Sequence, residues 1–179
     1  MDAVEINAGN HYLRTLRADD RLDDRPALVT AFADEAMRRW VYHYNVPDLE
    51  AAGRYVALRA QEWADDERCS WAVAEPATGE LLGEVGLKNL DLDAGTAEVA
   101  CWAHPLARGR GTTVEAIGAA LRFGFGALDL KEVSYDHAEG NAASARVAEK
   151  CGFTLSHKLR NEIEVDGRPE TLVVWTLRA

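Results

Sequence analysis

The chain has 179 residues, which fits one domain with a substantial core, and its 47% hydrophobic and 28% charged residues are ordinary for a globular protein. A net charge of -10 argues against a general nucleic-acid binder and is compatible with a cationic or amine ligand. No apolar run approaches the roughly 20 residues of a membrane span, and residues 1–5 lack a signal-peptide pattern. We therefore expect a single cytoplasmic domain, residues 1–179, with no membrane or nucleic-acid partner.

The N-terminal part of the chain predicts one strand and two helices. Residues 11–17 alternate between polar and apolar side chains, as a half-buried strand does. A first helix is expected from Asp24, which can cap free backbone amides, to about Arg39. The aromatic segment 40–47 breaks the helical pattern, and Asp48 is expected to cap the second helix.

The central and C-terminal parts alternate between strands and helices. Residues 70–104 predict three antiparallel strands joined by turns. From Val114 the apolar spacing changes to that of a helix, and a strand follows at 132–136. Asn141 is a typical cap for a short helix, and "DG" at 166–167 favours a tight hairpin between two final strands. This order predicts one α+β domain.

The stretch "RGRGTT", residues 108–113, stands where a strand ends and a helix begins. The first-turn amides of a helix lack partners and favour negative charge, glycines let the backbone approach a ligand, and arginines bind phosphate. The chemistry fits a pyrophosphate, with an ordinary glycine-rich connection as the alternative. A nucleotide P-loop would need Gly-Lys before Ser or Thr, and a dinucleotide fingerprint would need glycine at Val114, so both motifs fail.

The strand "AEVACW", the loop "ARGRGTTVEA" and the helix "EGNAASARVAEKCGF" together resemble the GNAT superfamily of N-acetyltransferases. Within it they are most similar to the Rim-type (RimL-like) branch, which acetylates protein N-termini and related amines. The resemblance implies a GNAT fold: a mixed, mostly antiparallel sheet of about seven strands, flanked by about four helices. It also implies that strand 4 bulges and splays from strand 5.

The same resemblance implies the reaction and its ligands. The co-substrate is expected to be acetyl-CoA, with no metal, and the acceptor a primary amine that attacks directly in a ternary complex. A protein N-terminus and a small amine both fit as acceptor, and a homodimer is left open. The alternative function is that of an acyl-CoA-binding sensor module with little turnover.

The resemblance places the co-substrate along the splayed strand and the glycine-rich loop. Strand backbone is expected to bond the pantetheine arm in the manner of an added strand, and loop amides are expected to hold the pyrophosphate. Thr113 departs from the family pattern, which has glycine or alanine there. The expected contacts are Cys101, Trp102, Ala103 and His104 on the strand and Arg108, Gly109, Arg110, Gly111, Thr112 and Thr113 in the loop.

Asn141 and Ser144 match the family's Asn-x-x-Ser at the start of the short helix. By that match Asn141 bonds the pantetheine arm, although Asn is also a common helix cap. Ser144 approaches the sulfur and supplies a proton to the leaving thiolate, with Tyr135 or a water as the alternative donor. Glu98 matches the family's strand carboxylate and is the candidate to take the amine's proton, directly or through water, with Glu84 as its rival.

Trp40, Tyr42 and Tyr44 fall at the helix break where family members line the acceptor groove. Aromatic faces can hold a cationic amine, and ordinary packing of the connection is the alternative. Together with Glu84 they form the expected substrate-binding set. His137 precedes the short helix and is expected in a surface loop.

Overall fold

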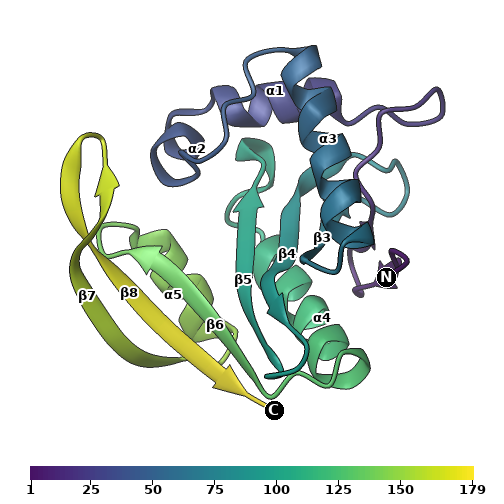
Figure 1. Ribbon diagram of the computed structural model, residues 1–179. Coiled ribbons are helices and arrows are strands. Elements are labelled where there is room, and N and C mark those ends of the chain that lie inside the picture. Colours follow the sequence, from purple (N-terminus) through teal and green to yellow (C-terminus); the bar gives the residue numbers. More distant parts are fainter.

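An eight-stranded open sheet carries the fold, and the computed structural model describes it over residues 1–179 (Figure 1). The strand order is β1-β2-β3-β4-β5-β6-β8-β7, and only β5 and β6 pair in parallel. The mixed, mostly antiparallel α+β fold is thus confirmed, and β1 raises the number of strands from about seven to eight. The strands are β1 (Ile6–Asn7), β2 (Tyr12–Arg14), β3 (Arg68–Ala74), β4 (Leu81–Asp91), β5 (Thr96–Ala103), β6 (Glu132–Ala138), β7 (Thr154–Val165) and β8 (Arg168–Arg178).

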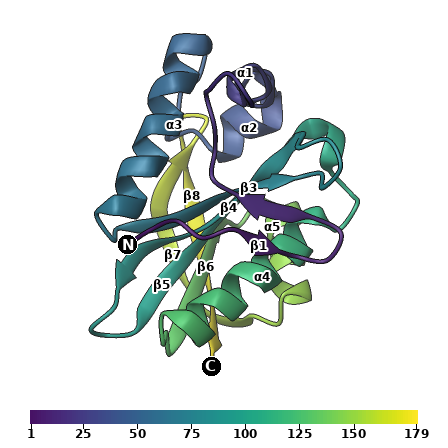
Figure 2. The same ribbon diagram turned by 90° about the vertical axis from the view of Figure 1, so that its right-hand side faces the viewer.

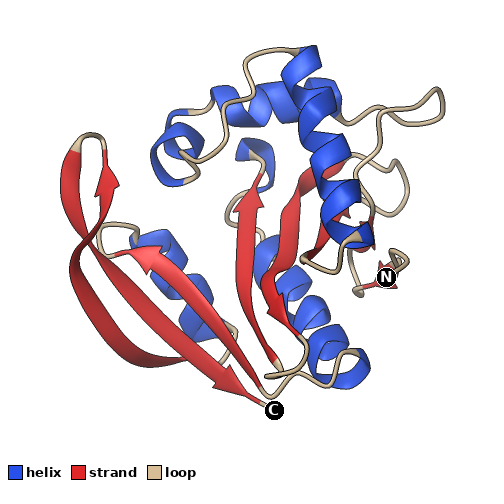
Figure 3. Cartoon of the chain, in the orientation of Figure 1, coloured by secondary structure: helices blue, strands red, loops and turns tan.

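Helices cover both faces of the sheet, as the blue and red elements of Figure 3 show. The helices are α1 (Arg25–Ala33), α2 (Glu35–Trp40), α3 (Leu49–Ala64), α4 (Thr112–Ala127) and α5 (Ala142–Lys150), with a short 3-10 turn, η1 (Pro105–Ala107). Figure 2 separates α1–α3 from α4 and α5 across the sheet. None of these helices combines the length and the apolar character needed to cross a membrane.

Two hydrophobic clusters fill the space between the sheet and these helix layers. The larger contains Ile117 and Leu121 of α4, packed on strands β3–β6. The smaller gathers Phe32 and Tyr55 of α1 and α3 around Trp102 of β5. Fully burying one such side chain contributes roughly 1.5–3 kcal/mol. Trp102 faces α1–α3 whereas its neighbour Cys101 packs against the α4 side, as strand alternation requires.

The sheet divides where β5 and β6 part (Figure 1). Their parallel pairing runs from Thr96 with Glu132 to Val99 with Tyr135, and no further. Beyond it, residues 100–103 of β5 remain paired only with β4, and β6 continues along β8. The predicted splay between strands 4 and 5 is confirmed, because those strands are β5 and β6.

The expected bulge of strand 4 at the splay is wrong. β4 and β5 pair without interruption from Gly83 with Ala103 to Lys88 with Glu98. Their register shifts only between Lys88 and Asp91, at the opposite end of β5. The two strands therefore separate because β6 turns away with β8, while β5 stays in register with β4.

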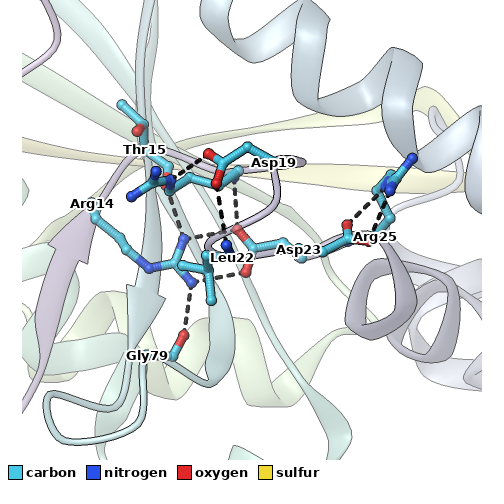
Figure 4. Close-up of polar contacts among 9 residues, drawn as sticks. Arg14, Thr15, Asp19, Leu22, Asp23, Arg25 and Gly79 are labelled. Carbon is cyan, nitrogen blue, oxygen red and sulfur yellow. Dashed lines mark hydrogen bonds and ion pairs between the residues drawn. The ribbon is translucent and has the colours of Figure 1, made fainter.

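The predicted strand 11–17 is shorter than expected, because a buried ion pair ends it. Arg14 is 5% exposed and donates to the two Asp24 carboxylate oxygens at 2.7 and 2.8 Å and to the Gly79 carbonyl at 2.8 Å (Figure 4). The Arg17 amide also donates to Asp24, at 2.8 Å. Asp24 precedes α1 but makes no side-chain cap there, because its carboxylate holds this loop.

The single helix predicted up to Arg39 is interrupted at Asp34. Asp34 is extended, with ψ 140°, and its carboxylate accepts from the Met37 amide at 3.1 Å, which caps α2. Aspartate favours such local bonds over a helix interior. The next predicted cap is confirmed: Asp48 accepts from the Ala51 amide at 2.8 Å and starts α3.

A long hairpin of β7 and β8 ends the chain. Asp166 and Gly167 have φ values of 52° and 72°, which confirms the tight turn. The register between the strands shifts twice, between Leu155 and His157 and between Leu159 and Ile163. β7 is the last strand of the sheet on this side, and its residues 154–162 are exposed.

A buried ion network fixes α3 on the sheet. Glu84 of β4 is 1% exposed and accepts hydrogen bonds from Tyr55 at 2.8 Å, Arg59 at 3.1 Å and Arg68 at 2.9 Å. Tyr55 and Arg59 belong to α3, and Arg68 to β3. Arg59 also pairs with Glu62 at 2.6 Å. Each buried guanidinium thus has a carboxylate partner, and burial next to Glu84 raises the pKa of Tyr55.

Removing Glu84 should destabilise the fold strongly. Glu84→Ala leaves Arg59 and Arg68 buried without their shared counter-charge, which costs about 3–5 kcal/mol. Urea denaturation followed by circular dichroism measures this loss. The matched control is Glu50→Ala. Glu50 and Arg54 form an exposed i,i+4 ion pair on α3, so this change should leave the midpoint unchanged. Equal midpoints for the Glu84 variant and the parent would contradict the network's role.

Candidate functional site

Two cavities meet where β5 and β6 part. The loop cavity, of about 500 Å³, lies between α2, the end of β5, the start of α4, and α5. The aromatic cavity, of about 580 Å³, lies between the α2–α3 connection, strands β4–β6 and the β7–β8 hairpin. Their shared wall consists of Trp40, Val41, Cys101, Trp102, Tyr135, Asn141 and Ser144.

The floor of the loop cavity is the start of α4. Gly109 and Gly111 have φ values of 78° and 80°, a conformation that other residues rarely adopt. Gly111 caps α4 without a side chain, so no side-chain acceptor caps the first-turn amides and the helix dipole favours an anion there. Thr112 and Thr113 also line this cavity. The loop thus has the geometry of a phosphate site.

The two arginines of the loop are placed differently from each other. Arg108 lines the loop cavity, and its guanidinium donates to Asp34, the cap of α2. This contact lowers the pKa of Asp34. Arg110 is exposed and is not part of the cavity wall, so its predicted contact with the co-substrate stays a prediction. The composition of the turn does not reveal this difference between the two arginines.

Two further cations reach the loop cavity from α5. Arg146 and Lys150 both line it, one helical turn apart. Sequence analysis missed them, although their i,i+4 spacing after Asn141 puts them on one helix face. They add positive charge opposite the start of α4. The cavity therefore offers helix amides on one side and two cations on the other, which suits a ligand with several phosphates.

The end of β5 forms one edge of the loop cavity. Cys101, Trp102 and Ala103 line it and lie beyond the last residue paired with β6. An extended ligand could therefore add to this edge as a strand does. The side chain of His104 is buried, and its Nδ1 accepts from the Leu106 amide at 3.3 Å to cap η1, so the contact predicted for its backbone stays a prediction. Burial lowers the pKa of His104.

A chain of hydroxyl groups stands in the shared wall. The Tyr135 Oη atom lies 2.8 Å from the Ser144 Oγ atom and 3.5 Å from the Cys101 Sγ atom. Asn141 caps α5 as predicted, and its Oδ1 accepts from the Ser144 amide at 3.1 Å. Burial raises the pKa of Tyr135 well above its usual value, so the phenol is protonated at neutral pH. The pair can donate a proton to a group bound at this wall.

Aromatic side chains make up part of the wall of the aromatic cavity. Trp40, Tyr42 and Tyr44 line it, as does His43. Tyr44 packs edge-on against Tyr55, with ring centroids 5.2 Å apart. Burial lowers the pKa of His43, which keeps that ring neutral near pH 7. This part of the wall is therefore largely aromatic.

Two carboxylates also line the aromatic cavity. Glu98 pairs through Oε1 with Lys88 at 2.7 Å, and its Oε2 accepts from Asn89 at 3.0 Å. Asp136 of β6 also lines the cavity, and its buried Oδ1 has no hydrogen-bond partner. Burial, followed by the charge of Glu98, raises the pKa of Asp136 to about 6. Glu84 is not part of either cavity wall, contrary to the prediction, because the buried network encloses it.

His137 is buried in β6, not exposed in a loop as predicted, because the strand continues to Ala138. The Trp175 indole donates to its Nε2 at 2.9 Å, and an indole nitrogen can only donate. Nε2 is therefore the acceptor, and Nδ1 carries the hydrogen that it donates to the Ala138 carbonyl at 2.7 Å. This neutral form has both nitrogens occupied, so His137 supports the wall of the cavity.

A family model described as "Acetyltransferase (GNAT) domain" matches residues 12–154. The chain belongs to this family. A curated relative from Bacillus subtilis (strain 168), named "Putative ribosomal N-acetyltransferase YdaF", is 32% identical over 99 residues, which are 55% of this chain and 54% of the relative. The match thus spans about half the length of that protein.

Solved structures of other acetyltransferases share the fold of this GNAT protein. Ribosomal-protein-S5-alanine acetyltransferase from Vibrio fischeri superposes with a TM-score of 0.82 at 14% identity, over 98% of this chain and 96% of that one. Spermidine N-acetyltransferase from Vibrio cholerae, in complex with CoA and spermine, gives 0.80 at 20% identity, over 94% and 95% of the two chains. At these identities the likeness establishes the fold alone.

Asp136→Asn should stabilise this GNAT domain at neutral pH. The folded-state pKa of about 6 lies above the ordinary value of 3.8, so the parent loses stability as pH rises through 6, when an unpartnered charge forms. Asn cannot ionise, so the variant should gain about 1 kcal/mol more over the parent at pH 8 than at pH 5, a figure reduced for partial exposure. Urea denaturation at both pH values measures the difference. A gain that is the same at both would contradict the buried, unpartnered carboxylate.

Proposed function

We propose that the protein transfers the acetyl group of acetyl-CoA to a primary amine, by direct attack in a ternary complex. The observation that carries the proposal is the meeting of two cavities at the unpaired edge of β5, with Tyr135 and Ser144 in their shared wall. Each cavity takes one substrate, and the reacting atoms meet at the wall. Membership of the GNAT family supports this division.

Acetyl-CoA is assigned to the loop cavity. The amides at the start of α4 receive the pyrophosphate, and Arg146 and Lys150 add charge for its phosphate groups. The pantetheine arm follows the edge of β5 at residues 101–103 and reaches Asn141. The thioester then lies beside Ser144.

The acceptor is assigned to the aromatic cavity and is a protein N-terminus or a small amine. Three aromatic residues of the cavity wall offer ring faces to a cationic amine: Trp40, Tyr42 and Tyr44. Relatives with this fold are named for both kinds of acceptor, a ribosomal-protein alanine and spermidine. A volume of about 580 Å³ is large enough for either.

The chemistry needs three groups, and the shared wall and the aromatic cavity supply them. Backbone amides of residues 100–102 are assigned to the thioester oxygen as it gains charge. Ser144 gives a proton to the leaving sulfur, with Tyr135 hydrogen-bonded behind it. The amine must lose a proton before it attacks, and two carboxylates line the cavity that receives it, Glu98 and Asp136.

Acetyl-CoA should stabilise the parent and fail to stabilise Gly111→Glu. A ligand at a hundredfold excess over its dissociation constant adds about 2.7 kcal/mol, whereas a glutamate at φ 80° strains the turn and repels phosphate. Thermal melting with and without millimolar acetyl-CoA measures both effects. The matched control is Gly126→Glu, at an exposed position of α4 with open space around it. A full shift in the Gly111 variant would contradict this seat for the pyrophosphate.

Ser144→Ala should retain acetyl-CoA binding and lose about a hundredfold in kcat, because only the departing thiolate loses its donor. Amine-dependent release of CoA thiol, assayed on a panel of N-terminal peptides, polyamines and amino acids, measures turnover. Ser156→Ala, an exposed serine on β7, is the control. A loss within threefold would remove Ser144 from the mechanism. Tight binding without turnover of any amine by the parent would instead identify an acyl-CoA sensor.

A further inference from the structure

The point where β5 and β6 part presents different chemistry to the two cavities. Tyr135 of β6 packs with Cys101 on the α4 side, and its hydroxyl bonds Ser144. Asp136 follows it and, because side chains alternate along a strand, belongs to the opposite side, where it lines the aromatic cavity with Glu98. Proton donors and carboxylates therefore stand next to each other in sequence on opposite faces of one strand.

The charges around the aromatic cavity leave one group without a partner. Arg59 and Arg68 both pair with Glu84, and Lys88 pairs with Glu98. Asp136 makes no ion pair, and its buried Oδ1 makes no hydrogen bond. A partly buried carboxylate with an unpartnered oxygen is costly unless a cation pairs with it. An ammonium group in the cavity would supply both the charge and the N–H donors.

We propose that Asp136 is the carboxylate that binds the acceptor's ammonium group and takes its proton. This rests on the proposed acetyl transfer and assigns the proton-accepting step to Asp136 in place of Glu98. Both oxygens of Glu98 already have donors, Lys88 and Asn89, whereas Asp136 has an oxygen with none. Asp136 also lies one residue beyond Tyr135, which makes the last pair of β6 with β5 and belongs to the shared wall.

Each proton that moves in the transfer has a donor and an acceptor. The acceptor R–NH₃⁺ gives one proton to Asp136, which releases it to water in the open cavity. The neutral nitrogen forms a bond to the thioester carbon, and the carbon–sulfur bond breaks. The sulfur leaves with a proton from Ser144, and the nitrogen's second proton restores that hydroxyl group. The products are the acetylated amine, CoA thiol and one proton.

The surroundings of Asp136 suit a group that both takes and releases a proton near neutral pH. Burial and the carboxylate of Glu98 on β5 raise its pKa to about 6, while Lys88 of β4 and His157 of β7 act in the opposite direction. His43 faces the same cavity from the α2–α3 connection, and its own pKa is lowered. A base with a pKa near the working pH is the most effective.

The activity test compares two carboxylates of the same cavity. Asp136→Asn should lower kcat/KM at least a hundredfold and abolish the acid limb of the pH profile near pH 6. Glu98→Gln should lose less than tenfold and move that limb to lower pH, because Glu98 raises the proton affinity of Asp136. Asp20→Asn, in an exposed loop, is the control and should match the parent. The proposal is overturned if Asp136→Asn stays within threefold of the parent with the limb unchanged.

A second measurement does not depend on turnover. The side-chain carboxyl ¹³C resonance of Asp136, assigned by its absence in Asp136→Asn, is titrated with and without propylammonium chloride. Binding of the ammonium favours the ionised form, so the midpoint should fall; an unchanged midpoint overturns the proposal. If the parent acetylates no amine, the proposed function has failed, and this titration alone decides whether Asp136 is an ammonium site.

Discussion

The parallel pairing of β5 and β6 ends after four residue pairs, and the candidate site depends on that limit. A continued ladder would close the sheet between the two cavities and cover the backbone edge at residues 101–103. β6 instead follows β8 away from β5, while β5 stays paired in register with β4. The opening is therefore held by regular strand pairing on both sides of it and needs no bulge.

Strand alternation then separates the chemistry of the two sides. Neighbouring residues of β6 place a phenol on one face and a carboxylate on the other, so the group that gives a proton and the group that takes one do not neutralise each other. The network around Glu84 also contributes, because it engages Arg59 and Arg68, which would otherwise compete with an ammonium group for Asp136. Asp136 is left as the carboxylate of this cavity without a cationic partner.

Local signals in the sequence predicted much of this arrangement. The glycine-rich loop, the Asn141 cap and the order of strands and helices are encoded by neighbouring residues, and the structure has them where they were expected. The burial of Glu84 and the enclosure of His137 depend on partners distant in the sequence, Arg68 at 16 residues and Trp175 at 38. Asp136 was missed because its significance lies in the hydrogen-bond partner that its Oδ1 lacks, and only the folded sheet reveals that absence.

The irregular register of the β7–β8 hairpin has a consequence of another kind. An edge strand displays unpaired backbone groups and is a template for association with a second sheet. β7 is long and exposed, but its pairing with β8 shifts twice, and Asn161 between the shifted segments has a φ of 55°. Lys158 and Arg160 add charges along the same strand. The edge is therefore irregular and carries charged side chains, which protects this protein against strand-to-strand aggregation through the one long edge that its sheet leaves open.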